Sequence, residues 1–391
     1  MLRTVIFTGR DGMTECGARS ALRSCLSRLL LTLNAVALVM LSSGCAAFES
    51  GSGVDSFVYV SGNSPEIHCY TYNAKSGALT ASSVSDGGNN PSYMAFAPDH
   101  KTAYAVNEGS GATVRAYRVN PINGALTLIS TTKTGGAGAC HLSVHPSGKW
   151  VYVAHYSSGH LSVLPVASDA SLSEPSEVIL AGVKAHMAIT DAEGKFLFVP
   201  TLGLDQVQVY RIDQSTGRLV KNNPSFISLL EKAGPRHMAF SPDQKHAYVI
   251  NELNWTLTSF SYDAEQGRAS GAHSIPTMAD YAGKGSCAHV MVSRDGHFVY
   301  GSNRGHNSIV ICKVDPVSGK LTAVGHESAN GEIRTPRNFN IDPSGNFMIV
   351  ASQDANYVTI FEINKDTGLL SKKSQVTCGD KPTFVGFLPR N

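Results

Sequence analysis

The sequence predicts an all-β protein, a seven-bladed β-propeller with four antiparallel strands in each blade. A strand-borne aromatic or large apolar residue recurs at intervals of 45 to 52 residues, and a tight turn comes before most of its copies. Repeats of this length that contain four short strands are typical of propeller blades. The recurring positions are Tyr59, Tyr104, Tyr152, Phe198, Tyr248, Tyr300 and Ile349.

The clearest copy of the repeat is the segment 234–253, GPRHMAFSPDQKHAYVINEL. Residues 236–240 and 247–250 are short apolar runs rich in β-formers, and 241–244 is a Ser-Pro-Asp-Gln turn. The segment therefore predicts a β-hairpin that forms the first two strands of a blade.

This hairpin places ionisable and polar residues at one edge of its sheet. Arg236 and His237 stand where the first strand begins, and Asn251 and Glu252 where the second ends. Those two ends lie side by side in an antiparallel pair. We therefore expect an arginine, a histidine and a carboxylate to meet there.

The third strand of each repeat is an apolar run that alternates with period two, as a half-buried strand should. A Gly-containing turn and a short fourth strand follow in most copies, although the third and fifth are less regular. The predicted third strands are 67–72, 114–119, 161–166, 207–212, 257–262, 309–314 and 358–363.

The two ends of the repeat region predict closure of the ring. The chain enters at residues 57–59 in a second strand and finishes at 384–388 in a first strand. We expect the C-terminal strand to complete the N-terminal blade, which would remove an open sheet edge. The propeller domain is predicted to span 57–391.

The N-terminus has the pattern of an export signal. Basic residues precede an apolar run at 29–41, and Ser-Ser-Gly-Cys follows, ending at Cys45. We expect a signal of lipoprotein type at 1–45, lipidation of Cys45 and a short tether at 46–56. The protein would then be periplasmic or anchored to a membrane through Cys45. An uncleaved N-terminal anchor, or a cytoplasmic protein with a misplaced start, are the alternatives.

Composition excludes several functions. The 391 residues are 42% hydrophobic and 16% charged, with a formal net charge of +2, and no basic run interleaved with aromatics indicates nucleic-acid binding. The five cysteines beyond Cys45 have no CxxC spacing, so neither a zinc site nor a disulfide framework is indicated. We expect no metal and no cofactor.

Blade by blade, the starts of the first strands and the ends of the second strands lie on one face. Arginine there suits a carboxylate or phosphate, and histidine suits proton transfer near neutral pH. The residues gathered are His141, His186, His237, His289, Arg236, Arg304, Arg337, Glu108 and Glu252. Each histidine could instead have a structural role, in which it bonds to the backbone of a neighbouring blade. Arg337 could instead form an ion pair with an acidic residue at the seam between two blades. Because alternate residues of a strand face opposite ways, we expect about half of these groups to face the channel.

Three segments resemble the bacterial seven-bladed 6-phosphogluconolactonase family, the lactonase propellers, from Phe57 to the C-terminus. They read AGPRHMAFSPDQKHAYVINEL, CAHVMVSRDGHFVYGSNR and TPRNFNIDPSGNFMIVASQDANYVTIFEI. The resemblance implies hydrolysis of 6-phosphoglucono-1,5-lactone to 6-phosphogluconate. The fold is shared with fungal carboxy-muconate lactonizing enzymes, whose site uses one His, two Arg and one Glu. His186, Arg236, Glu252 and Arg304 match that set in type and order.

These observations predict a catalytic set and a substrate-binding set. The catalytic set is His186, Arg236, Glu252 and Arg304, with His186 or Glu252 as the base, and the second set is His141, His237, His289 and Arg337. The expected partner is a small lactone, and no oligomeric state is predicted. A lactonizing cycloisomerase and a non-catalytic exported binding propeller remain as alternatives.

Overall fold

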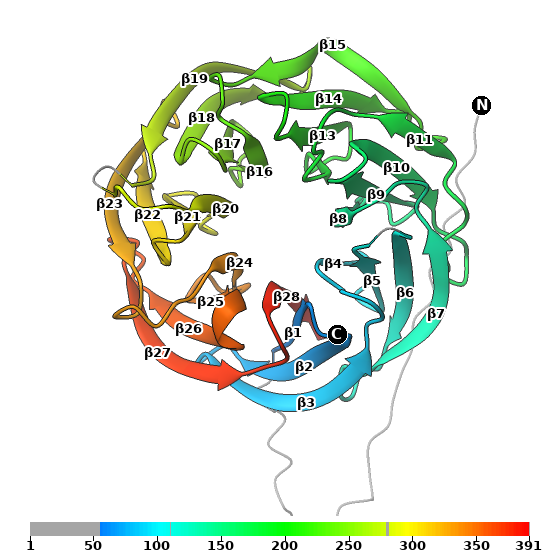
Figure 1. The fold of residues 1–391 in the computed structure, drawn as a ribbon, viewed down its shortest axis with the longest axis horizontal. Helices are drawn as coiled ribbons and strands as arrows, with labels where there is room; N and C mark the ends of the chain where they lie inside the picture. The colour runs from blue at the N-terminus through cyan, green and yellow to red at the C-terminus, as the bar shows by residue number, and fades with distance from the viewer. Residues whose placement is uncertain (1–54, 110, 279–280, 391) are drawn as a thin grey trace, which may run out of the picture. The chain divides into compact units, whose positions relative to one another are not determined.

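The computed structural model describes residues 55–109, 111–278 and 281–390. Seven four-stranded antiparallel sheets surround a central channel, which confirms the predicted seven-bladed propeller (Figure 1). The seven predicted third strands are all present, and their ends agree with the prediction to within one residue. Within the described ranges, no helix is long and apolar enough to cross a membrane.

The sheets are numbered as blades in chain order, each with its strands from the channel outward. Blade 1 is β28 (Pro382–Pro389), β1 (Ser56–Gly62), β2 (Glu66–Asn73) and β3 (Ala78–Asp86). Blade 2 is β4 (Met94–Phe96), β5 (Thr102–Asn107), β6 (Thr113–Val119) and β7 (Leu126–Lys133). Blade 3 is β8 (Ala139–Val144), β9 (Trp150–His155), β10 (His160–Pro165) and β11 (Glu177–Leu180). Blade 4 is β12 (Ile189–Thr190), β13 (Phe196–Thr201), β14 (Gln206–Ile212) and β15 (Leu219–Ser228).

The remaining three blades have the same order. Blade 5 is β16 (Pro235–Phe240), β17 (His246–Asn251), β18 (Thr256–Asp263) and β19 (Arg268–Pro276). Blade 6 is β20 (Ser286–Val292), β21 (Phe298–Arg304), β22 (Ser308–Val314) and β23 (Leu321–Glu327). Blade 7 is β24 (Pro336–Ile341), β25 (Phe347–Ser352), β26 (Tyr357–Ile363) and β27 (Leu370–Thr377), with a short 3-10 helix η1 (Gln353–Ala355) after β25.

Blade 1 closes the ring as predicted. Strand β28 pairs with β1 along its whole length, from Ser56 opposite Pro389 to Gly62 opposite Pro382. The last described strand therefore supplies the inner strand of the first blade. Both sides of β1 are paired, so the entering strand offers no open edge.

The recurring aromatic residue of the second strand lies at the seams between blades. Each copy is buried, and several tyrosines reach the next blade with their hydroxyls. The Tyr59 hydroxyl donates to the Gly124 carbonyl at 2.8 Å, and that of Tyr300 donates to Gly368 at 2.9 Å. Both glycines lie at turns with positive φ, where a Cβ would strike Phe57 or Phe298. The aromatic residue and the turn glycine thus recur together because they meet at the blade seams.

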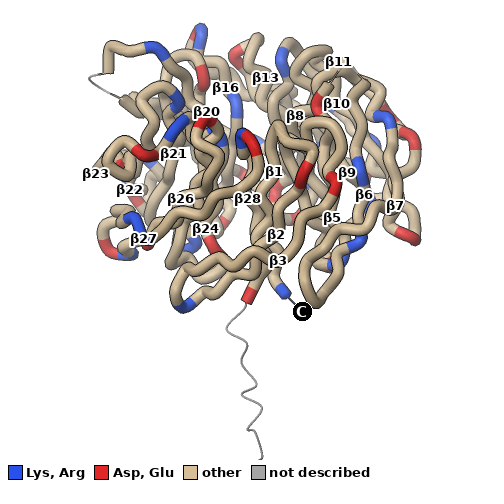
Figure 2. Tube along the Cα trace, turned by 60° about the horizontal axis from the view of Figure 1, so that its bottom comes forward, with Lys and Arg blue, Asp and Glu red and all other residues tan. Residues whose placement is uncertain are grey.

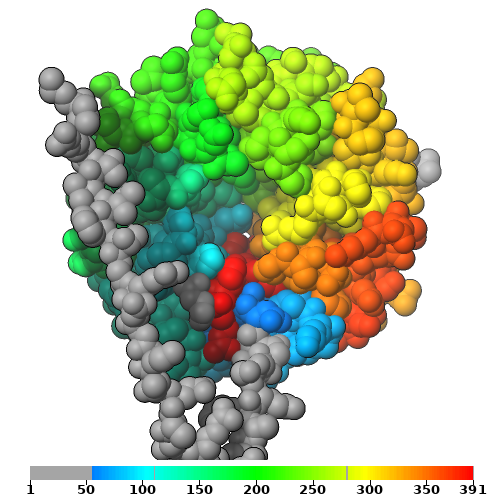
Figure 3. All heavy atoms as spheres, turned by 180° about the vertical axis from the view of Figure 1, so that it is seen from behind, coloured from blue at the N-terminus to red at the C-terminus, as the bar shows by residue number. Residues whose placement is uncertain are grey.

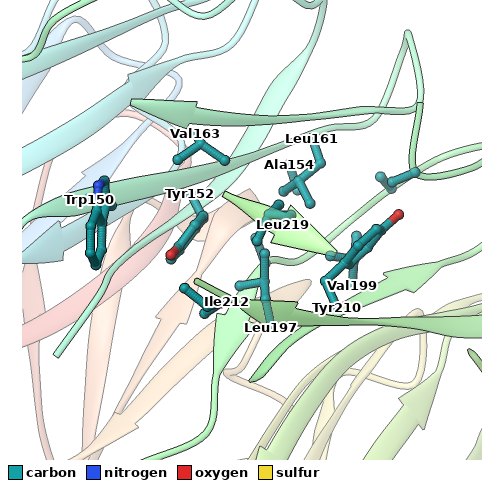
Figure 4. Close-up of a cluster of buried hydrophobic side chains, with 13 residues drawn as sticks. Trp150, Tyr152, Ala154, Leu161, Val163, Leu197, Val199, Tyr210, Ile212 and Leu219 are labelled. Atoms are coloured by element: carbon teal, nitrogen blue, oxygen red, sulfur yellow. The ribbon is translucent and has the colours of Figure 1, made fainter. Parts of the chain in front are cut away.

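The hydrophobic core lies between blades. At the seam of blades 3 and 4, Tyr152 and Leu161 of one sheet pack with Leu197, Val199 and Tyr210 of the next (Figure 4). Each fully buried large apolar side chain contributes about 1.5–3 kcal/mol. Seams of this kind hold the inner strands in a fixed ring, so the channel residues are positioned by the whole fold.

The propeller has two different faces. The site face carries the loops that lead into the first strands and follow the second strands. The turn face carries the hairpin turns between first and second strands. Asp55 and Arg390, at the two ends of the described propeller, lie together because the Arg390 amide donates to the Asp55 carbonyl at 3.3 Å. Both ends lie on the turn face, and the C-terminal end is marked at the bottom of Figure 2.

Candidate active site at the channel mouth

One side chain from each blade forms a ring inside the channel, where the first strands begin. The ring is mostly aromatic, with four imidazoles in successive blades, and its central member is His237. The His237 ring centroid lies 5.5 Å from that of His141, 5.3 Å from that of His186 and 5.0 Å from that of His289. The seven residues are Tyr93, His141, His186, His237, His289, Asn338 and Phe384. The repeated position therefore builds one layer across the channel.

A β-bulge accompanies this ring in several blades. In β16 the pairing passes from Pro235 opposite Asn251 to His237 opposite Ile250, which leaves Arg236 as the extra residue. A bulge re-aims side chains that a regular strand would send to opposite faces. Arg236 and His237 consequently line the same small cavity at the site-face end of the channel, the mouth cavity. Arg236 Nη1 lies 3.4 Å from His237 Nε2. We expected the alternation of a strand to direct neighbouring side chains to opposite faces, and this expectation is wrong for Arg236 and His237. Arg337 occupies the same bulged position in β24.

Glu252 joins two arginines from adjacent blades. Its Oε2 lies 2.9 Å from Nε of Arg236, and its Oε1 lies 3.1 Å from Nη2 of Arg304. The Arg236 side chain is 2% exposed and that of Glu252 18%. This contact is an ion pair, because the Nε–H of Arg236 makes no hydrogen bond with any residue that the structure describes. The predicted meeting of Arg236 and Glu252 at the hairpin edge is confirmed.

The two guanidiniums are further held by backbone carbonyls. Arg236 Nη1 donates to the Ala288 carbonyl at 2.5 Å, and Arg304 Nη2 donates to that of Cys287 at 2.9 Å. Burial and the proximity of Arg304 lower the pKa of Arg236 from its ordinary value. Arg236 nevertheless stays charged at neutral pH, since guanidinium is intrinsically a very weak acid and Glu252 opposes its charge. The trio carries one net positive charge.

His186 is a buried, neutral imidazole beside these cations. Burial, and then the charges of Arg236 and Arg337, hold the pKa of His186 well below its usual value. Its Nδ1 has no hydrogen-bond partner in the part of the chain that the structure describes. The ring packs edge-on against Tyr156, with centroids 5.5 Å apart. An imidazole that stays unprotonated at neutral pH can accept a proton there.

His237 and His289 share a hydrogen bond between their Nδ1 atoms, 2.7 Å apart. Since the Arg236 guanidinium can only donate to Nε2 of His237, a neutral His237 carries its proton on Nδ1 and donates it to His289. Burial and Arg236 lower the pKa of His289 to about 3, and the same causes hold that of His237 well below its usual value. The pair is therefore neutral and its tautomers are fixed.

The remaining predicted residues divide into two groups. His141 lies in the ring, and its ring centroid is 4.1 Å from that of Tyr93, with the two planes tilted by 35°. Its Nδ1 accepts from the Ala188 amide at 3.4 Å. Neither His141 nor His289 lines the mouth cavity, and Glu252 and Arg304 lie beside Arg236 without lining it. Arg337 does line it, and it makes no ion pair or hydrogen bond with any other described residue. The predicted alternative for Arg337, a pair with an acid at a seam, is not formed.

Some mouth residues were not selected from the sequence. Tyr93, Cys140 and Thr383 line the cavity with Glu108, which had been placed on this face without a role. The signal was present, because Tyr93 occupies the blade position at which four other blades have histidine. No three His, Cys, Asp or Glu side chains of the described ranges are grouped as metal ligands.

The sequence resembles those of known proteins over nearly the whole propeller. The sequence matches the family described as Lactonase, 7-bladed beta-propeller, over residues 57–387. It is 29% identical over 342 residues to the 6-phosphogluconolactonase of Bacillus subtilis, an alignment that covers 84% of this chain and 96% of that protein.

Two solved structures are similar over nearly their whole length. The periplasmic gluconolactonase of Pseudomonas aeruginosa superposes with a TM-score of 0.79 at 29% identity, covering 86% of this chain and 99% of that one. A protein of Bacteroides fragilis gives 0.79 at 31% identity, covering 87% and 99%. The chain therefore belongs to the lactonase family of seven-bladed β-propellers.

Proposed function

We propose that this protein hydrolyses a sugar lactone, in the manner of a 6-phosphogluconolactonase, at the channel mouth. The observation that carries the proposal is the buried Arg236–Glu252–Arg304 cluster beside the neutral imidazole of His186. Family membership supports it, as do relatives named 6-phosphogluconolactonase and gluconolactonase. The proposed substrate is 6-phosphoglucono-1,5-lactone, and the product is 6-phosphogluconate.

The arginines would bind the anionic substrate and stabilise the charge that develops on the lactone carbonyl oxygen. Arg236, Arg304 and Arg337 against Glu252 and Glu108 leave one net positive charge around the mouth. Fixed cations at the position where negative charge develops give a large share of catalysis in such sites. Arg236, Arg337 and Glu108 line an enclosed space that is small, so only the carbonyl end of the lactone would enter it.

His186 is the better of the two predicted bases. Both oxygens of Glu252 are engaged by arginines, which assigns that carboxylate to positioning the guanidiniums. His186 would take a proton from water while the water oxygen bonds to the carbonyl carbon. Cleavage of the ring C–O bond would then return that proton to the leaving alkoxide. The new carboxylic acid ionises, so one proton is released per turnover.

Export is part of this proposal. Residues 1–45, the lipidation site Cys45 and most of the tether lie outside the described residues. The N-terminal signal pattern and a similar protein that is named periplasmic support an exported enzyme. An exported enzyme would meet lactones outside the cytoplasm, including unphosphorylated ones.

The test is proton release by the purified protein with 6-phosphogluconolactone and gluconolactone side by side, after subtraction of spontaneous opening. We expect turnover of both lactones, with the lower KM for the phosphorylated one because the mouth is cationic. A folded protein with no rate above background would reject hydrolysis. An unsaturated acid could then be tested for ring closure, the lactonizing alternative, and failure of both reactions would favour the binding propeller.

A further inference from the structure

The channel has a second cavity, on the other side of the histidine ring. It opens on the turn face, because the β16–β17 turn, with Ser241 and Gln244, and the β20–β21 turn, with Arg294, line it. Its volume is about 480 Å³, within the range of small-molecule sites, about 300–1,000 Å³. The centre of this face is visibly hollowed (Figure 3). Tyr93 and Asn338 line both cavities, so the ring separates them.

Part of the wall of this second cavity, the turn-face cavity, is apolar. Met187, Met238 and Met291 come from three successive blades, and Ile189 and Phe384 add further carbon surface. Methionine side chains adapt to ligands of different shape, since they are unbranched and polarizable. A small ligand with an apolar body would therefore fit these walls.

The polar side chains of the wall are mostly committed to the protein. The Gln244 amide donates to the Ser241 carbonyl at 3.0 Å, and its oxygen accepts from the Ala192 amide at 3.3 Å. Asn340 donates to the Val385 carbonyl at 3.2 Å. A ligand would find few free partners there for hydroxyls or amides, which disfavours a sugar.

Arg294 differs from these side chains because it is charged, and among the described residues it is the one charged side chain that lines the turn-face cavity. It also donates to the carbonyls of Ile341 at 2.8 Å and Asp342 at 3.2 Å. No described carboxylate lies within ion-pair distance of it, and burial lowers its pKa. A partly desolvated cation beside apolar walls favours an anionic ligand group.

We propose that the turn-face cavity is a second ligand site, which binds a small apolar molecule carrying one carboxylate. Arg294 binds the carboxylate at the rim, and the methionine-lined wall binds the apolar part. The ligand class is that of a medium-chain fatty acid. This site differs from the mouth cavity, which is lined by Arg236, Arg337 and the neutral imidazoles of His186 and His237.

Calorimetric titration of the purified full-length protein with octanoate and with 1-octanol tests the proposal, and it needs no lactone turnover. We expect saturable octanoate binding that Ala239→Leu weakens at least about tenfold, since Ala239 lines the cavity and leucine would fill it. Arg294→Gln should weaken octanoate about tenfold and leave 1-octanol nearly unchanged. Arg268→Gln, a change at an exposed arginine, is the matched control and should bind like wild type.

Two results would overturn the proposal. One is octanoate binding weaker than about 1 mM in a protein whose folding is confirmed by circular dichroism. The other is binding that Arg337→Gln removes while Arg294→Gln and Ala239→Leu preserve it, which would place octanoate at the mouth. Because binding is measured directly, an enzyme that hydrolyses lactones but binds no octanoate would reject this site alone.

Discussion

The two ends of the channel are built by the same strands and differ in chemistry. At the site face, Arg236 and Arg304 converge on Glu252 next to His186. At the turn face, the same inner strands, a few residues further on, present methionines and a lone Arg294. The change occurs across one layer of buried imidazoles. A propeller can therefore carry two unrelated environments in one channel, because each first strand contributes separate residues to each end.

The bulge is the local reason for this difference. It directs two consecutive side chains, Arg236 and His237, to the mouth, whereas the regular strand beyond it alternates. Two arginines, Arg236 and Arg337, thus reach the mouth cavity from bulged positions. The predictions below test whether catalysis is confined to that end.

Removing the proposed base should have the largest effect. His186→Ala should lower kcat by about 10²–10⁴-fold, the usual contribution of a positioned acid–base group. Proton release with 6-phosphogluconolactone measures it, and circular dichroism controls for folding. A kcat within threefold of wild type would exclude His186 as the base.

Arg337, which forms no ion pair with any other described residue, should lower KM more for a phosphorylated lactone than for an unphosphorylated one. Arg337→Gln should raise KM for 6-phosphogluconolactone about tenfold, with a smaller change for gluconolactone, because an anionic ligand loses one charge-assisted contact. Initial rates with both lactones give the comparison. An equal change for both would mean that Arg337 does not bind the phosphate.

The pH dependence of the rate should show the depressed pKa of His186. A base must be unprotonated, so the rate falls as pH drops through its pKa in the folded enzyme. Burial and the neighbouring arginines hold that pKa well below 6.5, and activity should therefore persist to below pH 6. A kcat/KM profile measures this, and an acid limb centred at or above pH 6.5 would contradict it.

The ring itself should make stability depend on pH. Burial lowers the pKa of His141 from 6.5 to about 3, so between these values the unfolded chain binds a proton that the folded chain does not. The free energy of unfolding should fall as pH decreases through this window. His141→Gln should make that slope shallower by up to about 1.4 kcal/mol per pH unit. Urea titrations of both proteins from pH 7 to 4 measure the slopes, and parallel slopes would contradict a neutral, buried His141.

Most of the fold could be predicted because it depends on a repeat. The interval between Tyr59 and its equivalents fixes the blade number, and the strand that ends at Leu388 had only β1 left to pair with. The meeting of Arg236 and Glu252 followed from hairpin geometry. The contact between Arg236 and Glu252 is local to one hairpin, and the blade number follows from a pattern that recurs in every repeat.

The rest depends on contacts between blades, which no single repeat encodes. Glu252 reaches Arg304 because the Cys287 amide of blade 6 bonds the Glu252 carbonyl, at 3.3 Å. The bulge at Arg236 could not be recognised from residue types, since Cys140 and Arg337 occupy the same position in other blades. The turn-face cavity, too, is formed jointly by several first strands.

The most direct test of catalysis at the charged mouth compares two arginines. Arg236→Lys keeps the charge but loses the guanidinium fork that reaches Glu252 and the Ala288 carbonyl, whereas Arg268→Lys makes the same change at the exposed rim. Proton release with 6-phosphogluconolactone should show kcat/KM lowered about 10²–10³-fold for Arg236→Lys and within twofold of wild type for Arg268→Lys. Equal rates for the two folded variants would mean that the lactone is not hydrolysed at this mouth.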